Sequence, residues 1–195
     1  MDSIGSFYGM IRKGVAMAEA TDVIRLLKRI HQTRQFTNEA VSKDVVNDLL
    51  HVARWTGSAR NVQPWHFVVI DDRQELEKLS TIGKSATFFR EAPVVIAVVI
   101  DGKAAQSAFD EARVVERLFI AAAAHGLAAG IGSFSPETIP LASQRLKLPE
   151  GFKFHAGVAI GHAAPRATSS NTSEPARKSL ESIVHHGTFG TAFTS

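Results

Sequence analysis

The residues best suited to holding a ligand lie together in one short polar stretch, residues 58–67. Ser58, Asn61 and Gln63 carry hydroxyl or amide groups and Ala59 is small, so backbone N–H groups can approach a planar ligand here without side-chain bulk. This composition predicts the edge of a cofactor pocket. The alternative is that these residues only shape a connecting loop, as most loop residues do, and the stretch by itself leaves both interpretations open.

Two elements must position this stretch. Apolar residues recur at helical spacing over residues 43–56, after Ser42 as a cap and before Gly57 as a stop, which predicts a helix with one buried face. Residues 65–70 form an apolar run rich in β-branched and aromatic side chains, which predicts a strand packed on both faces. Pro64 cannot donate to a sheet and therefore belongs just before that strand.

Other patterns that carry chemistry are weak. Residues 127–134 are small and glycine-rich, but their glycines lack the G-x-G-x-x-G spacing of a dinucleotide-binding turn and follow a predicted helix instead of a strand. No G-x-S-x-G segment occurs, so a serine hydrolase is disfavoured. The chain has no cysteine, and the adjacent His185 and His186 point apart on most backbones, so we expect no metal site.

The composition indicates a folded chain with a small-molecule ligand. Its 195 residues are 45% hydrophobic and 21% charged, which suits one domain with a full core. The formal net charge is +3 and the basic residues are scattered, so neither nucleic acid nor a membrane is an expected partner. Without cysteine there is no disulfide framework. No apolar run approaches the roughly 20 residues that span a bilayer and no secretory leader is evident, so we expect a cytoplasmic protein.

The rest of the chain mixes helices and strands without regular βαβ alternation, which indicates an α+β fold. Residues 1–19 show no sustained periodicity, so we expect a flexible N-terminal extension before a single domain over residues 20–195. Further helices are expected over residues 21–30, 73–80, 104–125 and 135–146, further strands over residues 93–100 and 154–160, and an ordered tail over residues 177–184. Residues 166–176 indicate a connector or an arm, and residues 83–91 are ambiguous.

Four segments in the same order resemble the FMN-dependent nitroreductase family, over roughly residues 21–190. They are LLKRIHQTRQF, LLHVARWTGSARNVQPWHFVVI, AAAAHGLAAGIGSF and a late run from LKLPEGF through AGVAIGHAAPR to RKSLESIVHHGTFG. Each is unspecific alone, but four in order are specific. The resemblance implies a sheet flanked by helices and an intertwined homodimer with two FMN sites at its interface.

The resemblance assigns flavin contacts to three parts of the chain. It places Arg34 beside the pyrimidine edge and ribityl chain, where a cation stabilises the negative charge of the reduced ring. Gly132 and Ser133 fall where backbone N–H groups lie near flavin N5 and O4, since small residues let the main chain approach the ring.

The polar stretch described first supplies the third part. Ser58, Ala59 and Asn61 match positions that reach the flavin, in part from the neighbouring subunit. The resemblance thereby favours the cofactor-pocket interpretation over a plain connection.

The phosphate end of the expected site departs from the family. Gln32 falls near the phosphate, where the family often has serine. Ile30 stands where the family usually has an arginine, whose planar fork matches a phosphate with two hydrogen bonds. We expect a neighbour, Arg29 or His31, or Arg177 and Lys178 from the tail, to take over that role.

The resemblance implies an FMN-dependent oxidoreductase that takes reducing equivalents from NAD(P)H. It passes them to a nitroaromatic, a quinone or a similar small-molecule acceptor by a ping-pong mechanism. The flavin carries the chemistry, so no catalytic residue is expected and Arg34 tunes the ring. Two alternatives remain open: other flavin chemistry on the same fold, namely dehydrogenation, dehalogenation or flavin destruction, and a non-catalytic flavin-binding or interaction protein, which the departure at Ile30 favours.

Overall fold

The computed structural model describes residues 20–103, 107–165 and 177–193. The chain divides into two compact units, Met1–Ile30 and His31–Ser195. The expected flexible extension over residues 1–19 and the expected connector over residues 166–176 lie outside the described residues. The single domain over residues 20–195 stays a prediction.

Four strands of the second unit form one antiparallel sheet. β1 (Trp65–Ile70) and β3 (Ala128–Ser133) are its edges, and β2 (Val94–Asp101) and β4 (Phe152–Gly161) lie between them in the order β1-β2-β4-β3. β2 is buried from Val94 to Ile100, as expected for an apolar strand packed on both faces. The same expectation for β1 was wrong, because β1 is an edge strand that leaves His66 and Val69 exposed. The antiparallel sheet and its separate helices confirm the α+β class.

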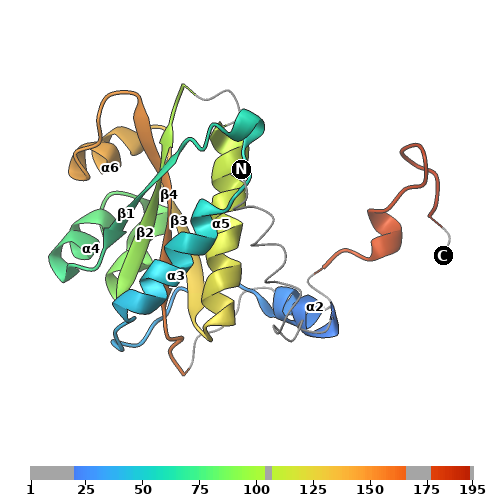
Figure 1. Ribbon diagram of the computed structural model, residues 1–195, viewed down its shortest axis with the longest axis horizontal. Helices are drawn as coiled ribbons and strands as arrows, with labels where there is room; N and C mark the ends of the chain where they lie inside the picture. The colour runs from blue at the N-terminus through green and yellow to red at the C-terminus, as the bar shows by residue number, and fades with distance from the viewer. Residues whose placement is uncertain (1–19, 104–106, 166–176, 194–195) are drawn as a thin grey trace, which may run out of the picture. The chain divides into compact units, whose positions relative to one another are not determined.

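Helices cover both faces of this sheet (Figure 1). On one face, α3 (Lys43–Arg54) packs on α5 (Ser107–Ala124), and α5 packs against β2, β3 and β4. The other face carries α4 (Arg73–Ser80), the 3-10 segment η2 (Lys84–Glu91) and α6 (Ile139–Arg145). The two faces therefore offer different surroundings to side chains that alternate along a strand.

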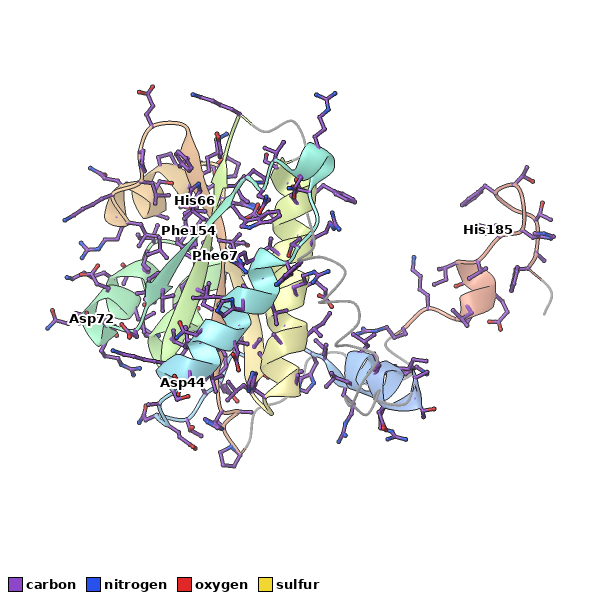
Figure 2. All side chains as sticks on the ribbon, viewed as in Figure 1. Asp44, His66, Phe67, Asp72, Phe154 and His185 are labelled. Carbon is purple, nitrogen blue, oxygen red and sulfur yellow. The ribbon has the colours of Figure 1, made fainter. Side chains whose placement is uncertain are left out.

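Local hydrogen bonds explain where the helices begin. The Ser42 hydroxyl accepts the N–H of Val45 (3.3 Å), and the Asp72 carboxylate, marked at the start of α4 in Figure 2, accepts the N–H of Glu75 (3.0 Å). These are N-caps, and the first confirms the expected cap. α6 begins at Ile139, later than expected, because residues 135–138 first form a turn closed by hydrogen bonds between Ser135 and Thr138.

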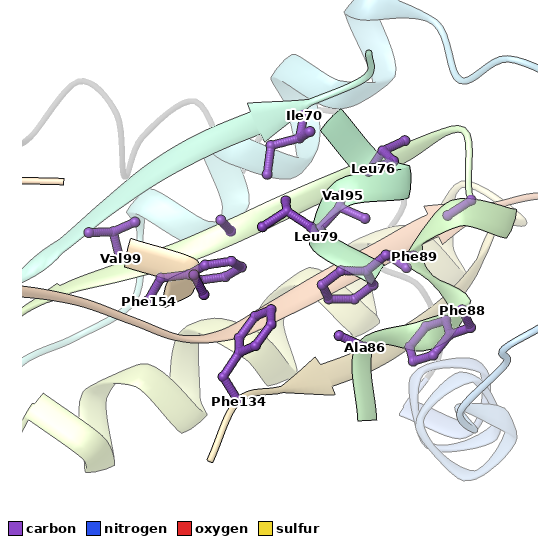
Figure 3. Packing of buried hydrophobic residues seen from close by; sticks show 14 of the residues in the cluster. Ile70, Leu76, Leu79, Ala86, Phe88, Phe89, Val95, Val99, Phe134 and Phe154 are labelled. Atoms are coloured by element: carbon purple, nitrogen blue, oxygen red, sulfur yellow. The ribbon is translucent and has the colours of Figure 1, made fainter. Parts of the chain in front are cut away.

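An apolar cluster of buried residues fills the space between the sheet and the layer of α4, η2 and α6 (Figure 3). The ring centroids of Phe89 and Phe134 are 6.3 Å apart, and those of Phe134 and Phe154 are 4.9 Å apart. A Cβ atom added to Gly132 would lie 2.5 Å from Cε1 of Phe89. A glycine in β3 is therefore what lets η2 pack on this strand.

Two apolar segments stay uncovered in the described part of the chain. α2 (Ala20–Arg29), in the first unit, confirms the helix expected over residues 21–30, yet none of its residues is buried, and Val23, Ile24 and Leu27 are 46%, 52% and 45% exposed. Residues 177–193 contain one 3-10 turn, Leu180–Ser182. Phe189 in this segment is 93% exposed. Amphipathic segments of this kind bury their apolar side only against another surface.

Candidate functional site

Residues 31–36 lie along the outer edge of β3, and this contact builds the first part of the candidate site. The N–H of Thr33 donates to the carbonyl of Ala129 (2.8 Å), and Gln32 forms a parallel bridge to the same residue. The Oε1 atom of Gln32 accepts the N–H of Ile131 (3.2 Å). The structure thus uses the Gln32 amide oxygen to hold the segment on the strand, and a phosphate contact of Gln32 stays a prediction.

Gly130 makes this close approach possible. A Cβ atom at this position would lie 2.0 Å from the carbonyl oxygen of Thr33 and 3.0 Å from Cε2 of Phe88. No real Cβ atom occupies such a position, so only glycine lets the two backbones and η2 meet. The glycine-rich composition of β3 therefore serves packing, which agrees with the rejection of a dinucleotide-binding turn.

Arg34 extends its guanidinium over the ring of Phe88, with 5.7 Å between Cζ and the ring centroid. Phe88 is buried and Arg34 is exposed. A cation over an aromatic face is held in place without using its N–H groups. Among the described residues no carboxylate forms an ion pair with Arg34, so no acid in this part of the chain balances the charge of its guanidinium.

The backbone of β3 directs alternate N–H groups to opposite sides. The N–H of Ile131 points outward to Gln32, whereas the N–H of Phe134 points inward to the carbonyl of His155 on β4 (2.9 Å). By this alternation Ser133 presents its N–H at the open edge, and Gly132 presents its N–H to β4. Contacts of both residues with a flavin stay predictions, but only Ser133 offers an outward donor.

The polar loop before β1 holds its shape through its own hydrogen bonds. The Ser58 hydroxyl accepts the N–H of Gln63 (2.8 Å), and the Ser58 carbonyl accepts the N–H of Asn61 (3.0 Å). Arg60, Asn61 and Gln63 have φ angles of 54°, 56° and 50°. This left-handed region costs a non-glycine residue on the order of 1–3 kcal/mol and concentrates at ligand clamps, which favours a functional loop.

One chain does not bring this loop and Arg34 together. Ala59 and Asn61 bound the turn η1 (Ala59–Asn61) ahead of β1, whereas Arg34 lies beside β3, and these strands are opposite edges of the sheet. Three strand spacings separate them by roughly 14 Å. Arg177 and Lys178 are exposed in the tail, and no contact between described residues joins them to either group.

α5 ties the polar loop to the helical layer. Arg113 donates from Nη1 to the carbonyl of Gly57, next to Ser58. The same nitrogen lies 3.8 Å from the carboxylate of Asp110, which is buried. The conformation of the loop is thereby linked to the first turns of α5.

Sequence reasoning missed a buried acid on α5. The Oε2 atom of Glu111 lies 3.3 Å from Nδ1 of His155, and no described residue pairs with its Oε1 atom. Burial raises the pKa of the Glu111 carboxyl, and the His155 ring and the backbone of Ala156 oppose that rise. The signal was available: Glu111 stands three and seven residues before Val114 and Leu118 on the apolar stripe, where an apolar residue is expected.

The residues at the β3 edge fit a flavin ring. A guanidinium that pairs with no described acid and an outward N–H at an open strand edge are donors, and the carbonyl and imine atoms of an isoalloxazine are acceptors. The described residues hold no group of three or more His, Cys, Asp or Glu side chains positioned for a metal ion. Over the same ranges, no helix combines the length and apolarity that crossing a membrane requires.

Sequence comparison connects the chain to known proteins. The sequence model of the nitroreductase family matches residues 28–162. A protein of Methanothermobacter thermautotrophicus, provisionally named an NADH dehydrogenase/NAD(P)H nitroreductase, is 30% identical over 80 residues, which span 41% of this chain and less than half, 42%, of that protein. An FMN reductase (NAD(P)H) of Bacillus subtilis is 22% identical over 190 residues, which span 86% of this chain and 74% of that protein.

Solved structures share the fold. An FMN-dependent nitroreductase from Clostridium difficile superposes with a TM-score of 0.75 at 19% identity, over 85% of this chain and 99% of that one. A nitroreductase from Bacteroides fragilis, solved with bound FMN, gives a TM-score of 0.65 at 21% identity, over 76% of this chain and 92% of that one. At these identities the likeness establishes the arrangement of helices and strands.

Proposed function

Because this chain belongs to the nitroreductase family, whose sequence model matches residues 28–162, we propose that it is an FMN-dependent oxidoreductase. It takes reducing equivalents from NAD(P)H and passes them to a small-molecule acceptor, a nitroaromatic or a quinone, in a ping-pong cycle. The names of similar proteins, FMN reductase and FMN-dependent nitroreductase, support this proposal.

The observation that carries the proposal is the exposed guanidinium of Arg34 beside the open edge of β3. When bound, FMN supplies the hydride chemistry. Arg34, held 5.7 Å from the Phe88 ring centroid, provides the positive charge that stabilises an anionic reduced ring. The outward N–H of Ser133 orients the ring by donating to it, and Gly130 lets the segment that carries Arg34 lie against β3.

We further propose a homodimer in which each FMN site takes residues from two chains. The loop with Ser58, Ala59 and Asn61 and the segment with Arg34 lie at opposite edges of one sheet, so a single ring contacts both groups only if a second copy supplies one of them. The uncovered apolar stripe of α2 and the exposed Phe189 support a dimer, since both need a surface to bury them.

For the phosphate we propose partners other than the residue at position 30. Ile30 carries no charge, whereas a phosphate needs a cation or several N–H donors. His31 adjoins that position, and Arg177 and Lys178 are exposed in the tail. Double replacement of Arg177 and Lys178 by Ala should weaken FMN binding more than riboflavin binding, because riboflavin lacks the phosphate.

The decisive experiment is an absorbance spectrum of the purified protein before and after anaerobic NAD(P)H. We expect a yellow protein whose flavin bleaches and recovers when a quinone is added. Arg34→Ala should weaken FMN binding at least tenfold, with Arg90→Ala as the matched control, because Arg90 is also an exposed arginine next to Phe89 in η2. Light scattering should give the mass of a dimer for both variants.

Three results would contradict the proposal in different ways. A colourless protein that takes up no added FMN would exclude a flavoprotein. Irreversible loss of flavin absorbance would indicate a flavin-destroying enzyme, and FMN that NAD(P)H does not reduce would indicate another reaction or a binding role. Retained turnover in Arg34→Ala would remove Arg34 from the site.

A further inference from the structure

A buried carboxyl and a histidine meet between α5 and β4. The Oε2 atom of Glu111 lies 3.3 Å from Nδ1 of His155. The Glu111 side chain is 9% exposed and that of His155 is 54% exposed. Hence the acid is enclosed, and the ring that it meets through Nδ1 is half exposed.

The backbone of β4 aims His155 at this acid through a β-bulge. Val98 of β2 pairs with Ala156, whereas Val99 pairs with Phe154, so His155 is an extra residue without a partner on β2. A bulge turns a side chain away from the regular alternation and is common beside active sites. Phe154 packs in the cluster on the η2 face, and His155 instead meets α5 on the opposite face.

The pair adjoins the part of β3 that faces the flavin in the proposed function. The carbonyl of His155 accepts the N–H of Phe134 (2.9 Å), and Ala156 pairs with Ser133. Residues paired across an antiparallel ladder have Cα atoms about 5 Å apart. His155 thus lies one row beyond Ser133, whose N–H is the outward donor of the β3 edge.

The arrangement is that of an oriented acid–base group. A carboxylate on Nδ1 fixes the tautomer and direction of an imidazole and leaves Nε2 to exchange a proton with a ligand. The remaining Oε1 atom of Glu111 lacks a partner in the described part of the chain, which is a costly state for a buried carboxylate that serves packing alone. The interaction with His155 lowers the pKa of the Glu111 carboxyl, against the effect of burial.

We propose that His155, oriented by Glu111, is the general acid that protonates the acceptor while it is reduced. The inference rests on the proposed function. For a quinone, one hydrogen arrives with the electron pair as a hydride and adds to the acceptor. The second is the Nε2 proton of His155, whose N–H bond breaks as an O–H bond forms on the acceptor, and His155 then regains a proton from solvent. Glu111 acts as a positioning residue.

The position of the Glu111 proton also suits this role. Burial raises the pKa of its carboxyl, and the charge of His155 lowers it, so proton occupancy of the pair is shared between the two groups. Loss of the His155 proton to the acceptor leaves a neutral ring beside the acid.

The test compares two acceptors in FMN-loaded dimers by stopped-flow absorbance. A quinone needs a proton, and ferricyanide takes electrons without one. With the quinone, we expect His155→Gln to slow flavin reoxidation about 100-fold, within the range for general acid catalysis, and Glu111→Gln about tenfold. With ferricyanide, and in reduction by NAD(P)H, both variants should match the wild type. Glu116→Gln, an exposed acid on the same helix, is the matched control and should change neither rate.

A second readout does not depend on turnover. In NMR spectra recorded without NAD(P)H, the imidazole signals of His155 should move in Glu111→Gln, because the ring loses its contact with Oε2 of Glu111, and should not move in Glu116→Gln. Quinone reoxidation in His155→Gln within twofold of the wild type would overturn the proposal, as would unchanged His155 imidazole signals in Glu111→Gln. If ferricyanide also fails to reoxidise the wild-type flavin, the proposed function itself is refuted.

Discussion

Replacing Gly130 by alanine tests whether β3 and residues 31–36 form the site together. The new Cβ would lie 2.0 Å from the carbonyl oxygen of Thr33, whereas carbon and oxygen in contact stay about 3.3 Å apart. Residues 31–36 must therefore move away from β3 by the difference between those two distances, which is more than about 1 Å. Phe88, 3.0 Å from the same Cβ, blocks the alternative of turning the strand toward η2.

The retreat breaks two contacts that hold the segment. These are the hydrogen bond from Thr33 to Ala129 (2.8 Å) and the one from Ile131 to Gln32 (3.2 Å), worth about 1 kcal/mol each. Overpacking adds about 1–3 kcal/mol. The free energy of unfolding should then fall by about 4 kcal/mol, which lowers the melting temperature by about 8–16 °C for a chain of this size.

Two measurements, thermal unfolding and FMN titration by fluorescence, check this prediction. Because Arg34 moves with the segment, the Kd for FMN should rise at least tenfold. The control is Gly126→Ala, where a Cβ meets nothing within 4 Å but φ is +70°; we expect a loss of about 1 kcal/mol and unchanged FMN affinity. A Gly130→Ala protein that melts within 2 °C of the wild type, or that binds FMN equally well, would refute the reasoning.

Three further variants test separate contacts. Arg145 holds the pKa of Glu75 at about 2, below the ordinary 4.5. The ion pair therefore stabilises the fold fully above pH 4.5, and its contribution disappears as pH falls toward 2. In urea unfolding at acid pH, the free energy of unfolding should fall more steeply in the wild type than in Glu75→Gln. Arg113→Lys should weaken FMN binding several-fold with little change in melting temperature, because the hydrogen bond to Gly57 is lost but the charge is kept. Burial raises the pKa of Glu111 above the ordinary 4.5, so the folded chain loses stability as pH rises from 4.5 through the raised pKa. Glu111→Gln should therefore gain stability relative to the wild type as pH rises above 4.5, which urea unfolding at a series of pH values measures.

Elements with a strong periodic signal were predictable from the sequence. The run at residues 65–70 and the helix over residues 73–80 have the expected bounds, and β2 and β4 differ from expectation by one or two residues at their ends. β3 was not predictable as a strand, because Ala128–Ser133 contains small residues with weak strand preference. Its extended form depends on pairing with β4, a contact between segments about 30 residues apart.

In the candidate site, the sequence predicted only those residues that stand at matching positions of the family motifs. Arg34 and the Ser58 loop came from the family resemblance, and their roles as ligand contacts stay predictions. Sequence patterns do not report that Arg60 and Gln63 adopt left-handed backbone angles, since neither residue is a glycine. They also do not report the bulge at His155, which arises from a register shift between two strands.

The first turns of α5 serve both parts of the site, although its apolar stripe suggests a structural helix. Residues two apart on a helix point in nearly opposite directions. Glu111 accordingly faces β4 and meets His155, while Arg113 faces the loop and donates to the carbonyl of Gly57. One helix thus contacts both a histidine next to β3 and the backbone beside Ser58. These two places belong to opposite ends of the strand order, β3 and β1, which the proposed dimer brings together around FMN. We therefore propose that the polar residues at the start of α5 belong to the site, although the apolar pattern of the helix suggests a structural role.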